Sequence, residues 1–467
     1  MSKFDQLTGF ISDIFSSSKE SGAKKTSVDS KETLKKAAVP NNDDLTPSQR
    51  HALDLMVMGS NVFITGGAGT GKSFLLRRFL ETRNDVLVTA PTGVAARNVG
   101  GTTLHRAFKL PIGIISDSVA DDADDKKNSF ISKANAKKRR KLLKACNVLV
   151  IDEISMCRAD AFAYIADMIL SEERRRHHIQ VILCGDFAQL PPVISKKEQD
   201  MFSQLFPDNP RGWAFITPQW QRLAITTVEL KEIVRQKDAN FAMALNDLRR
   251  GNAYALNYVN SWHCRDEISD AVTICGTNKA ASEINNSHLE QLSGSERVYR
   301  LSSDGEVKNG DISCETELAL KVGAKVIILV NDLKDNLYQN GSFGTITDML
   351  PDSVTVRLED TGRTVEICKN TWEIYGYDTD EITQTILRKT IGTYTQLPLR
   401  LGWAETVHKS QGATYKAVNL IPQAFWETGQ LYVALSRCVS LNTLYFPGNI
   451  SRYNLKTSSE FLEYFGA

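Results

Sequence analysis

The amino-acid sequence predicts an α/β protein with two parallel-sheet domains in tandem. Three observations support this fold class: a length of 467 residues, short continuous apolar runs, and helical stretches between those runs. The length exceeds what a single hydrophobic core usually organises. Continuous apolar runs are typical of parallel strands that are covered on both faces. We therefore expect a first domain over residues 45–225 and a second domain over residues 226–467.

Eight apolar runs are the expected strands. Four lie in the first half of the chain, at residues 62–64, 86–88, 148–151 and 181–183. The other four follow at residues 228–230, 272–275, 418–421 and 444–446. We assign the first four to the first domain and the last four to the second.

Two segments interrupt this alternation and are interpreted as insertions. Residues 109–140 carry an acidic run followed by a basic run, which indicates an insertion in the first domain. Residues of about 311–395 read as all-β, because alternating runs at 354–358 and 363–367 flank a turn at 360–362. We expect this segment to form a small β-barrel inserted in the second domain.

Residues 1–44 differ from the rest of the chain. From residue 16 onward they are rich in Ser, Lys and Asp, a composition that predicts a disordered tail. Ahead of this tail, apolar residues between Phe4 and Phe15 recur at helical spacing. The short amphipathic segment either docks on its own protein or binds a partner, such as a replication clamp, and the sequence leaves both readings open.

The composition of the chain limits which partners the protein can bind and in which cellular compartment it is expected. The net charge is only +1, so any binding to nucleic acid needs a locally positive groove. The eight cysteines form no C-x-x-C pair, which argues against zinc knuckles and favours reduced thiols in an intracellular compartment of a cell or of a phage host. No apolar run approaches the ~18 residues of a membrane span, and no secretory signal is evident, so we expect no membrane partner.

A phosphate-binding loop stands between an expected strand and an expected helix. Residues 66–73 match the pattern G-x-x-x-x-G-K-[ST]. Glycines let the backbone wrap phosphates with its N–H groups, a lysine neutralises them, and the following hydroxyl holds Mg²⁺. The expected ATP-binding residues here are Gly66, Gly67, Ala68, Gly69, Thr70, Gly71, Lys72 and Ser73.

Two carboxylates complete a nucleotide-hydrolysing site. Asp152 and Glu153 follow the apolar run at 148–151, where Asp152 can reach Mg²⁺ and Glu153 can polarise the attacking water. This combination predicts an NTPase without saying which kind. Gln49 suits the edge of adenine, or it is a surface residue beside a helix cap at Thr46 or Ser48, and spacing alone does not separate these readings.

Seven further segments occur in a fixed order. They are residues 89–96 (TAPTGVAA), 101–105 (GTTLH), 151–156 (IDEISM), 185–193 (GDFAQLPPV), 235–236 (RQ), 407–412 (VHKSQG) and 430–437 (QLYVALSR). From Gln49 to Arg437 the chain thereby resembles the superfamily 1B DNA helicases of the petite-integration-frequency (Pif-type) family, which is related to RecD and to the phage helicase Dda. The resemblance implies two RecA-like domains, a wedge-like insertion and an inserted SH3-like β-barrel.

The resemblance also implies an activity. Such a protein uses ATP and Mg²⁺, moves 5′ to 3′ along single-stranded DNA, and opens fork DNA during replication, repair or recombination. Gln189 would sense the γ-phosphate, Gly412 would line the nucleotide site, and Arg235 and Arg437 would reach the phosphate across a domain cleft, unless either arginine is only a surface ion pair. The residues expected to grip DNA are Thr92, Gly93, Thr103, His105, His408, Lys409 and Ser410.

Other functions remain to be weighed against this one. A single-stranded-DNA-dependent ATPase or translocase with little unwinding would share every motif, since only a wedge, with Phe108 or Phe130 as candidates, distinguishes it. An inactive scaffold is disfavoured by the intact Lys72, Asp152 and Glu153. A phosphate-loop kinase would need neither the second domain nor the segment at 407–412.

Overall fold

The computed structural model describes residues 44–466, except for residues 82, 84, 111–112, 116–125, 175–176, 235–237, 333, 336, 380–385 and 423–424. For residues 126–135, 377–379 and 386–388 the description is limited to the backbone. The N-terminal segment with its expected amphipathic helix therefore lies outside the described residues, and so does Arg235. The predicted α/β fold with two parallel sheets is confirmed.

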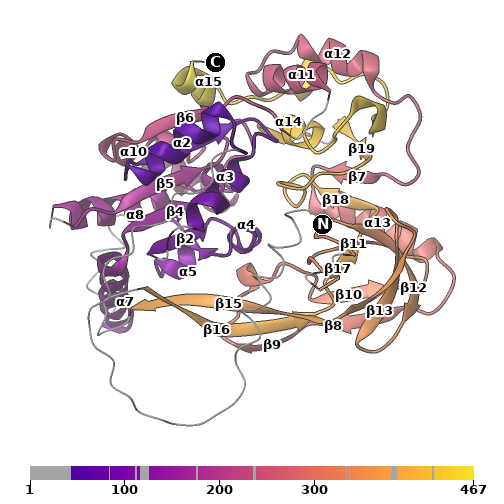
Figure 1. The fold of residues 1–467 in the computed structure, drawn as a ribbon, viewed down its shortest axis with the longest axis horizontal. Coiled ribbons are helices and arrows are strands. Elements are labelled where there is room, and N and C mark those ends of the chain that lie inside the picture. Colours follow the sequence, from indigo (N-terminus) through magenta and orange to yellow (C-terminus); the bar gives the residue numbers. More distant parts are fainter. Residues whose placement is uncertain are drawn as a thin grey trace. The chain divides into compact units, whose positions relative to one another are not determined.

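The first domain is built on a six-stranded parallel sheet in the order β3-β2-β4-β5-β1-β6 (Figure 1). Its strands are β1 (Val62–Gly66), β2 (Val86–Ala90), β3 (Thr102–Thr103), β4 (Val148–Ile151), β5 (Gln180–Cys184) and β6 (Thr226–Leu230). Its main helices are α2 (Pro47–Val57), α3 (Lys72–Leu80), α4 (Gly93–Asn98), α5 (Leu104–Ala107), α7 (Lys126–Ala145) and α8 (Ala159–Glu173). Within β1, Val62 and Ile64 pack in one buried cluster and Phe63 packs in another, so both faces of the sheet are covered.

The strand at 226–230 corrects the expected domain boundary. We assigned residues 228–230 to the second domain, but β6 pairs in parallel with β1 at the edge of the first sheet, from Val62 opposite Thr226 to Gly66 opposite Leu230. The apolar run alone could not show which sheet it joins, because both sheets accept the same kind of strand. The boundary at residue 225 is therefore wrong, and the first sheet extends to Leu230.

The second domain contains a four-stranded parallel sheet in the order β18-β7-β19-β20. Its strands are β7 (Val272–Cys275), β18 (Ala404–Thr406), β19 (Val418–Leu420) and β20 (Leu444–Tyr445). The associated helices are α11 (Ala239–Arg249), α12 (Ala255–Trp262), α13 (Asn278–Gln291) and α14 (Gln430–Leu435). Three of these strands fall on predicted apolar runs; β18 was not anticipated.

Between β7 and β18 the chain forms antiparallel sheets. A five-stranded sheet has the order β14-β13-β12-β11-β17, built from β11 (Lys325–Ile328), β12 (Phe343–Met349), β13 (Ser353–Leu358), β14 (Thr364–Cys368) and β17 (Leu399–Leu401). The remaining strands are β8 (Arg297–Arg300), β9 (Ser302–Gly305), β10 (Glu317–Leu320), β15 (Asn370–Thr379) and β16 (Ile386–Gln396). The expected hairpin is formed by β13 and β14, with Gly362 at φ 67° in its turn. The closed SH3-like barrel stays a prediction.

The C-terminal helix α15 (Ser459–Phe465) also departs from the expected division of the chain. Phe465 lies 6.0 Å, ring centre to ring centre, from Phe63 of β1, and it also packs beside Phe187 and Phe215. These three partners belong to the first half of the chain. The range 226–467 therefore does not form one independent unit, because its last helix completes the core of the first domain.

The predicted insertion at 109–140 contributes α7, which contacts β15. Phe108 is fully buried in the core of the first domain, so it cannot stack on a DNA junction, and its nomination as a wedge residue was wrong. The side chain of Phe130 lies outside the described residues. All eight cysteines are free thiols. Among the residues that the structure describes, no helix is both long and apolar enough to cross a membrane.

Candidate functional site

The phosphate loop connects β1 to α3 with the backbone shape that phosphate binding requires. Gly69 and Gly71 adopt left-handed conformations, at φ 82° and 83°, that side chains with a Cβ rarely adopt. The Lys72 ammonium donates to the carbonyl oxygens of Gly66 and Gly67 at 2.8 and 3.1 Å. Ser73 follows on the exposed side of the first helical turn. The loop thus presents a cation and backbone N–H groups together.

Gln49 is buried against this loop. Of the two residues that we expected could cap helix α2, Thr46 is the N-cap, and it forms a capping box with Gln49. Gln49 is nevertheless only 2% exposed, and its Nε2 donates to the Thr70 carbonyl at 3.0 Å. A Cβ at Gly71 would collide with the same amide group. Gln49 therefore braces the phosphate loop, and the reading that places it on the surface does not fit.

Asp152 and Glu153 follow β4 beside the loop. Glu153 has a left-handed backbone at φ 51°, a strained conformation for a residue with a Cβ, which turns it away from the strand direction. Burial, followed by the charge of Asp152, raises the pKa of Glu153 to about 7. Burial also raises the pKa of Asp152. A carboxyl group with a pKa near 7 is suited to accepting a proton at neutral pH.

Gln411 joins the two domains at these carboxylates. Its Nε2 donates to Glu153 Oε2 at 3.0 Å and to Gln189 Oε1 at 3.1 Å. Glu153 and Gln189 come from the first domain, whereas Gln411 lies in the loop after β18. A single second-domain amide therefore bridges the two side chains that we expected to act on the attacking water and on the γ-phosphate.

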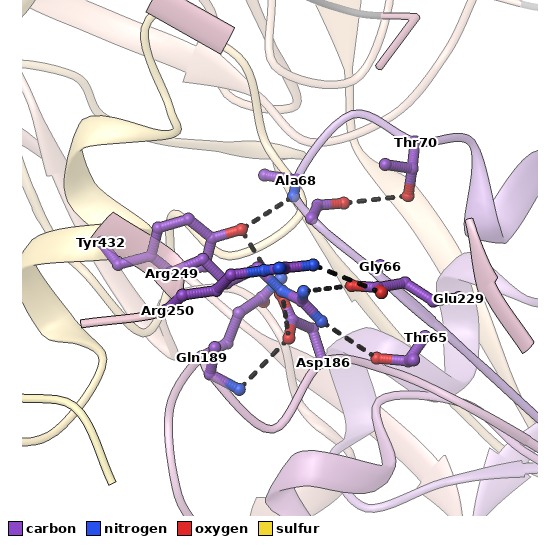
Figure 2. Close-up of polar contacts among 12 residues, drawn as sticks. Thr65, Gly66, Ala68, Thr70, Asp186, Gln189, Glu229, Arg249, Arg250 and Tyr432 are labelled. Carbon is purple, nitrogen blue, oxygen red and sulfur yellow. Dashed lines mark hydrogen bonds and ion pairs between the residues drawn. The ribbon is translucent and has the colours of Figure 1, made fainter. Parts of the chain in front are cut away.

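A buried ionic network lies beside the phosphate loop (Figure 2). Arg249 of α11 contacts both oxygens of Asp186 through Nε, at 3.0 and 3.1 Å, and donates to Glu229 of β6 at 2.6 Å. Its side chain is 3% exposed, and that of Asp186 is fully buried. The hydroxyl of Tyr432 donates to Asp186 Oδ2 at 3.4 Å and accepts the Ala68 N–H at 2.9 Å.

Arg437 is fixed within the second domain. Its guanidinium donates to the carbonyl oxygens of Val433, Ser410 and Ala413, and it is 2% exposed. It is therefore not a surface ion pair. Its charge also acts to lower the pKa of Glu153.

The first-domain residues expected to bind DNA lie at the starts of two short helices. Thr92 caps α4 by accepting the Ala95 N–H, and Thr103 caps α5 by accepting the Arg106 N–H. Gly93 lies against the segment of antiparallel strands at residues 297–401, called the β-rich segment below, since a Cβ there would come within 2.6 Å of the Gly310 carbonyl oxygen. His105 is exposed.

Contacts from the β-rich segment cover this region. Arg106 of α5 forms a buried ion pair with Asp311. Thr102 donates to the Tyr375 carbonyl at 3.1 Å. A pocket of about 270 Å³ lies between these elements, with Gly93, Thr103 and Trp372 in its lining. Threonine, glycine and aromatic groups in one pocket are compatible with a nucleotide and its phosphate.

The second-domain residues expected to bind DNA share the loop after β18. His408 is half-buried, and burial lowers the pKa of its ring, so the ring is neutral near pH 7. Lys409 is exposed and pairs with Glu315 at 3.2 Å. Ser410 is fully buried and donates to the Val407 carbonyl, so in this conformation its hydroxyl shapes the loop. Gly412 is exposed with φ 81°.

Four residues at the centre of the site were not nominated from the sequence: Asp186, Arg249, Gln411 and Tyr432. Three of them stand inside segments that we quoted, namely 185–193, 407–412 and 430–437. Their place inside those segments was the sequence signal that could have identified them as site residues. Arg249 stands outside every quoted segment, and only its burial against Asp186 reveals it.

Comparison with known proteins gives a consistent result. The family model described as PIF1-like helicase matches residues 44–257. The ATP-dependent DNA helicase Pif1 of Bdellovibrio bacteriovorus is 33% identical over 421 residues, which cover 87% of this chain and 88% of that protein. The ATP-dependent DNA helicase PIF1 of Danio rerio is 34% identical over 427 residues, which cover 87% of this chain and 61% of that protein.

Solved structures give the same result. The structure of Bacteroides sp Pif1 in complex with ADP-AlF4 matches with a TM-score of 0.77 at 31% identity, covering 90% of this chain and 96% of that one. The structure of Bacteroides Pif1 bound to ssDNA matches with a TM-score of 0.62 at 32% identity, with the same coverage. These likenesses support the assignment of both parallel-sheet domains as RecA-like.

Proposed function

This chain belongs to the PIF1-like helicase family, and from that premise we propose that it is an ATP-dependent DNA helicase that moves 5′ to 3′ along single-stranded DNA. One observation carries the proposal: residues of both domains meet at the phosphate loop and its carboxylates. Tyr432 contacts Ala68, and Gln411 contacts Glu153. A site built in this way couples nucleotide chemistry to the relative position of two domains, as a stepping motor requires.

The site has the residues that ATP and Mg²⁺ need. The loop contains left-handed glycines at Gly69 and Gly71, as phosphate-binding loops do, and the Lys72 ammonium donates to its Gly66 and Gly67 carbonyl oxygens. The loop N–H groups and Lys72 would hold the phosphates, while Ser73 and Asp152 would hold Mg²⁺. The metal ion would offset the negative charge of the phosphates.

Glu153 is the proposed acceptor for the proton of the attacking water. Its raised pKa keeps it a usable base near pH 7. Gln411 holds it beside Gln189, so a movement of the second domain alters the position of the base and of the proposed phosphate sensor together. Arg437, and Arg235 from outside the described residues, are the proposed cations that stabilise the transferring phosphate when the domains close.

The DNA strand would run across both domains. The helix starts at Thr92 and Thr103 offer backbone N–H groups and hydroxyls to phosphates, as does the loop after β18. The Arg106–Asp311 pair and the contact of Gly93 with Gly310 cover the first-domain part of this path. The β-rich segment must therefore shift for the strand to lie there. Fork DNA in replication, repair or recombination is the proposed substrate.

ATP hydrolysis with and without single-stranded DNA tests this proposal. DNA should stimulate turnover by the full chain, and Lys72→Ala should lower turnover about a hundredfold or more, because the loop would lose the cation that neutralises the phosphates. Lys279→Ala, at an exposed lysine of α13, is the matched control and should behave as the unaltered protein. Turnover in Lys72→Ala equal to that of this control would remove the phosphate loop from the mechanism.

A further inference from the structure

The Tyr432 hydroxyl occupies a backbone donor of the phosphate loop. Tyr432 lies on α14 of the second domain and is buried, yet its oxygen accepts the N–H of Ala68 from the first domain at 2.9 Å (Figure 2). The same hydroxyl donates to Asp186 Oδ2, with 3.4 Å between the two oxygens. Arg249 contacts that carboxylate through Nε at 3.0 Å.

A phosphate in the loop would need the same donor. Backbone N–H groups of such loops cradle the phosphates of a bound nucleotide, and an N–H shared between two acceptors cannot be well aligned with both of them. The Tyr432 oxygen also lies close to the preceding loop residue, since a Cβ at Gly67 would lie 3.5 Å from it. The tyrosine and a phosphate oxygen would therefore compete for the Ala68 N–H in this geometry.

We propose that Tyr432 competes with nucleotide phosphate for the Ala68 N–H, so that phosphate binding releases α14 from the phosphate loop. The proposal rests on the proposed ATP site and adds a coupling element to it. Tyr432 is not a catalytic residue in this account. It positions α14, and its release frees that helix to move.

Release of α14 would affect the residues at its two ends. Arg437 lies two residues beyond the end of this helix and is bonded to the carbonyl oxygen of Val433 within it. At the start of the helix, Gly429 is packed so closely on the Gln189 carbonyl that a Cβ there would collide with it. A movement of α14 would therefore be transmitted both to the candidate arginine and to the loop of the candidate phosphate sensor.

Tyr432→Phe tests the competition with little change in shape. Equilibrium titration with ADP should give a dissociation constant about 2- to 12-fold lower than that of the unaltered protein, the range expected for the removal of one competing hydrogen bond. Adenosine, which has no phosphate, should bind both proteins equally. The same variant should also gain more thermal stability from saturating ADP than the unaltered protein does.

Tyr415→Phe is the matched control. Tyr415 is buried in the same domain, and its hydroxyl has no hydrogen-bond partner among the described residues, so its loss should leave ADP affinity unchanged. Unchanged or weaker ADP binding in Tyr432→Phe, beside normal binding in the unaltered protein, would overturn the competition and leave the ATP site intact. A failure of the unaltered protein to bind ADP would instead overturn the proposed function, and the inference with it.

Discussion

Arg437 shows at the scale of a single residue how the site depends on movement. The sequence placed it as a cation for the transferring phosphate, and the structure holds its guanidinium on three carbonyl oxygens of its own domain. These bonds keep a charged group stable in a buried position. If Arg437 acts on the phosphate, it must exchange these partners for phosphate oxygens, and it would do so only when the domains close.

Replacement of Arg437 tests this exchange. Arg437→Ala should lower DNA-stimulated ATP turnover about a thousandfold, the scale of a lost arginine finger. ATP affinity should change far less, because little contact with the bound ground state is removed. Arg437→Lys should restore turnover only in part, since an ammonium lacks the planar guanidinium geometry. Steady-state turnover and nucleotide titrations measure the two effects separately.

Arg297→Ala is the control for this prediction, because Arg297 is exposed on β8 and donates to the Met349 carbonyl, outside the candidate site. It should hydrolyse ATP as the unaltered protein does. If Arg437→Ala also stays within a fewfold of that rate, Arg437 has a structural role only. Domain closure would then not serve to bring this arginine to the phosphate.

Individual residues were predictable where local sequence determines their role. The phosphate loop and the Asp152–Glu153 pair follow from short patterns beside apolar runs, and the structure places them together. Tyr432 and Gln411 were not predictable as partners of Ala68 and Glu153, because these pairs are separated by 364 and 258 positions along the chain. Only the tertiary fold brings such side chains into contact.

At the scale of elements, strands that are buried on both faces were predicted well. Each of the eight apolar runs overlaps a strand, since continuous burial leaves a clear signature in the sequence. The sheet to which each strand belongs was harder to predict from the sequence. The run at 228–230 joined the first sheet, and the short strand β18 gave no apolar run of its own. Pairing partners depend on chain topology, which apolar periodicity does not encode.

The C-terminal helix gives an element-scale prediction. Phe461 of α15 is 1% exposed and packs between Phe465 and the guanidinium of Arg249. Phe461→Ala should therefore destabilise the protein by about 3–5 kcal/mol, the usual cost of removing a buried aromatic ring. Urea-induced unfolding measures this loss. Tyr453→Ala, at a tyrosine that is 70% exposed, should cost much less, and equal losses in both variants would show that the Phe461 ring is not held in a packed core.

At the scale of the whole molecule, the two domains share their chemistry. The first domain contributes the loop, the carboxylates and Gln189, and the second contributes Gln411, Tyr432 and Arg437. The expected division at residue 225 missed this sharing, because β6 and α15 return residues of the second half to the first domain. Because both domains contribute residues to the candidate site, a change in the distance between the domains would change the geometry of that site.

Movement of the domains against each other would carry the protein along DNA. The proposed grips lie at Thr92 and Thr103 on one domain and in the loop after β18 on the other. If both grips hold the same strand with alternating strength, each round of hydrolysis advances the protein. The membership of the chain in the PIF1-like family favours a 5′-to-3′ direction for this movement.

Strand separation on tailed duplexes tests the central claim most directly. With ATP and Mg²⁺, the full chain should open a duplex that carries only a 5′ single-stranded tail and leave a duplex with only a 3′ tail closed. Lys72→Ala should open neither. Efficient opening from the 3′ tail alone would contradict the proposed direction, and ATP hydrolysis without opening of either duplex would show a translocase rather than a helicase.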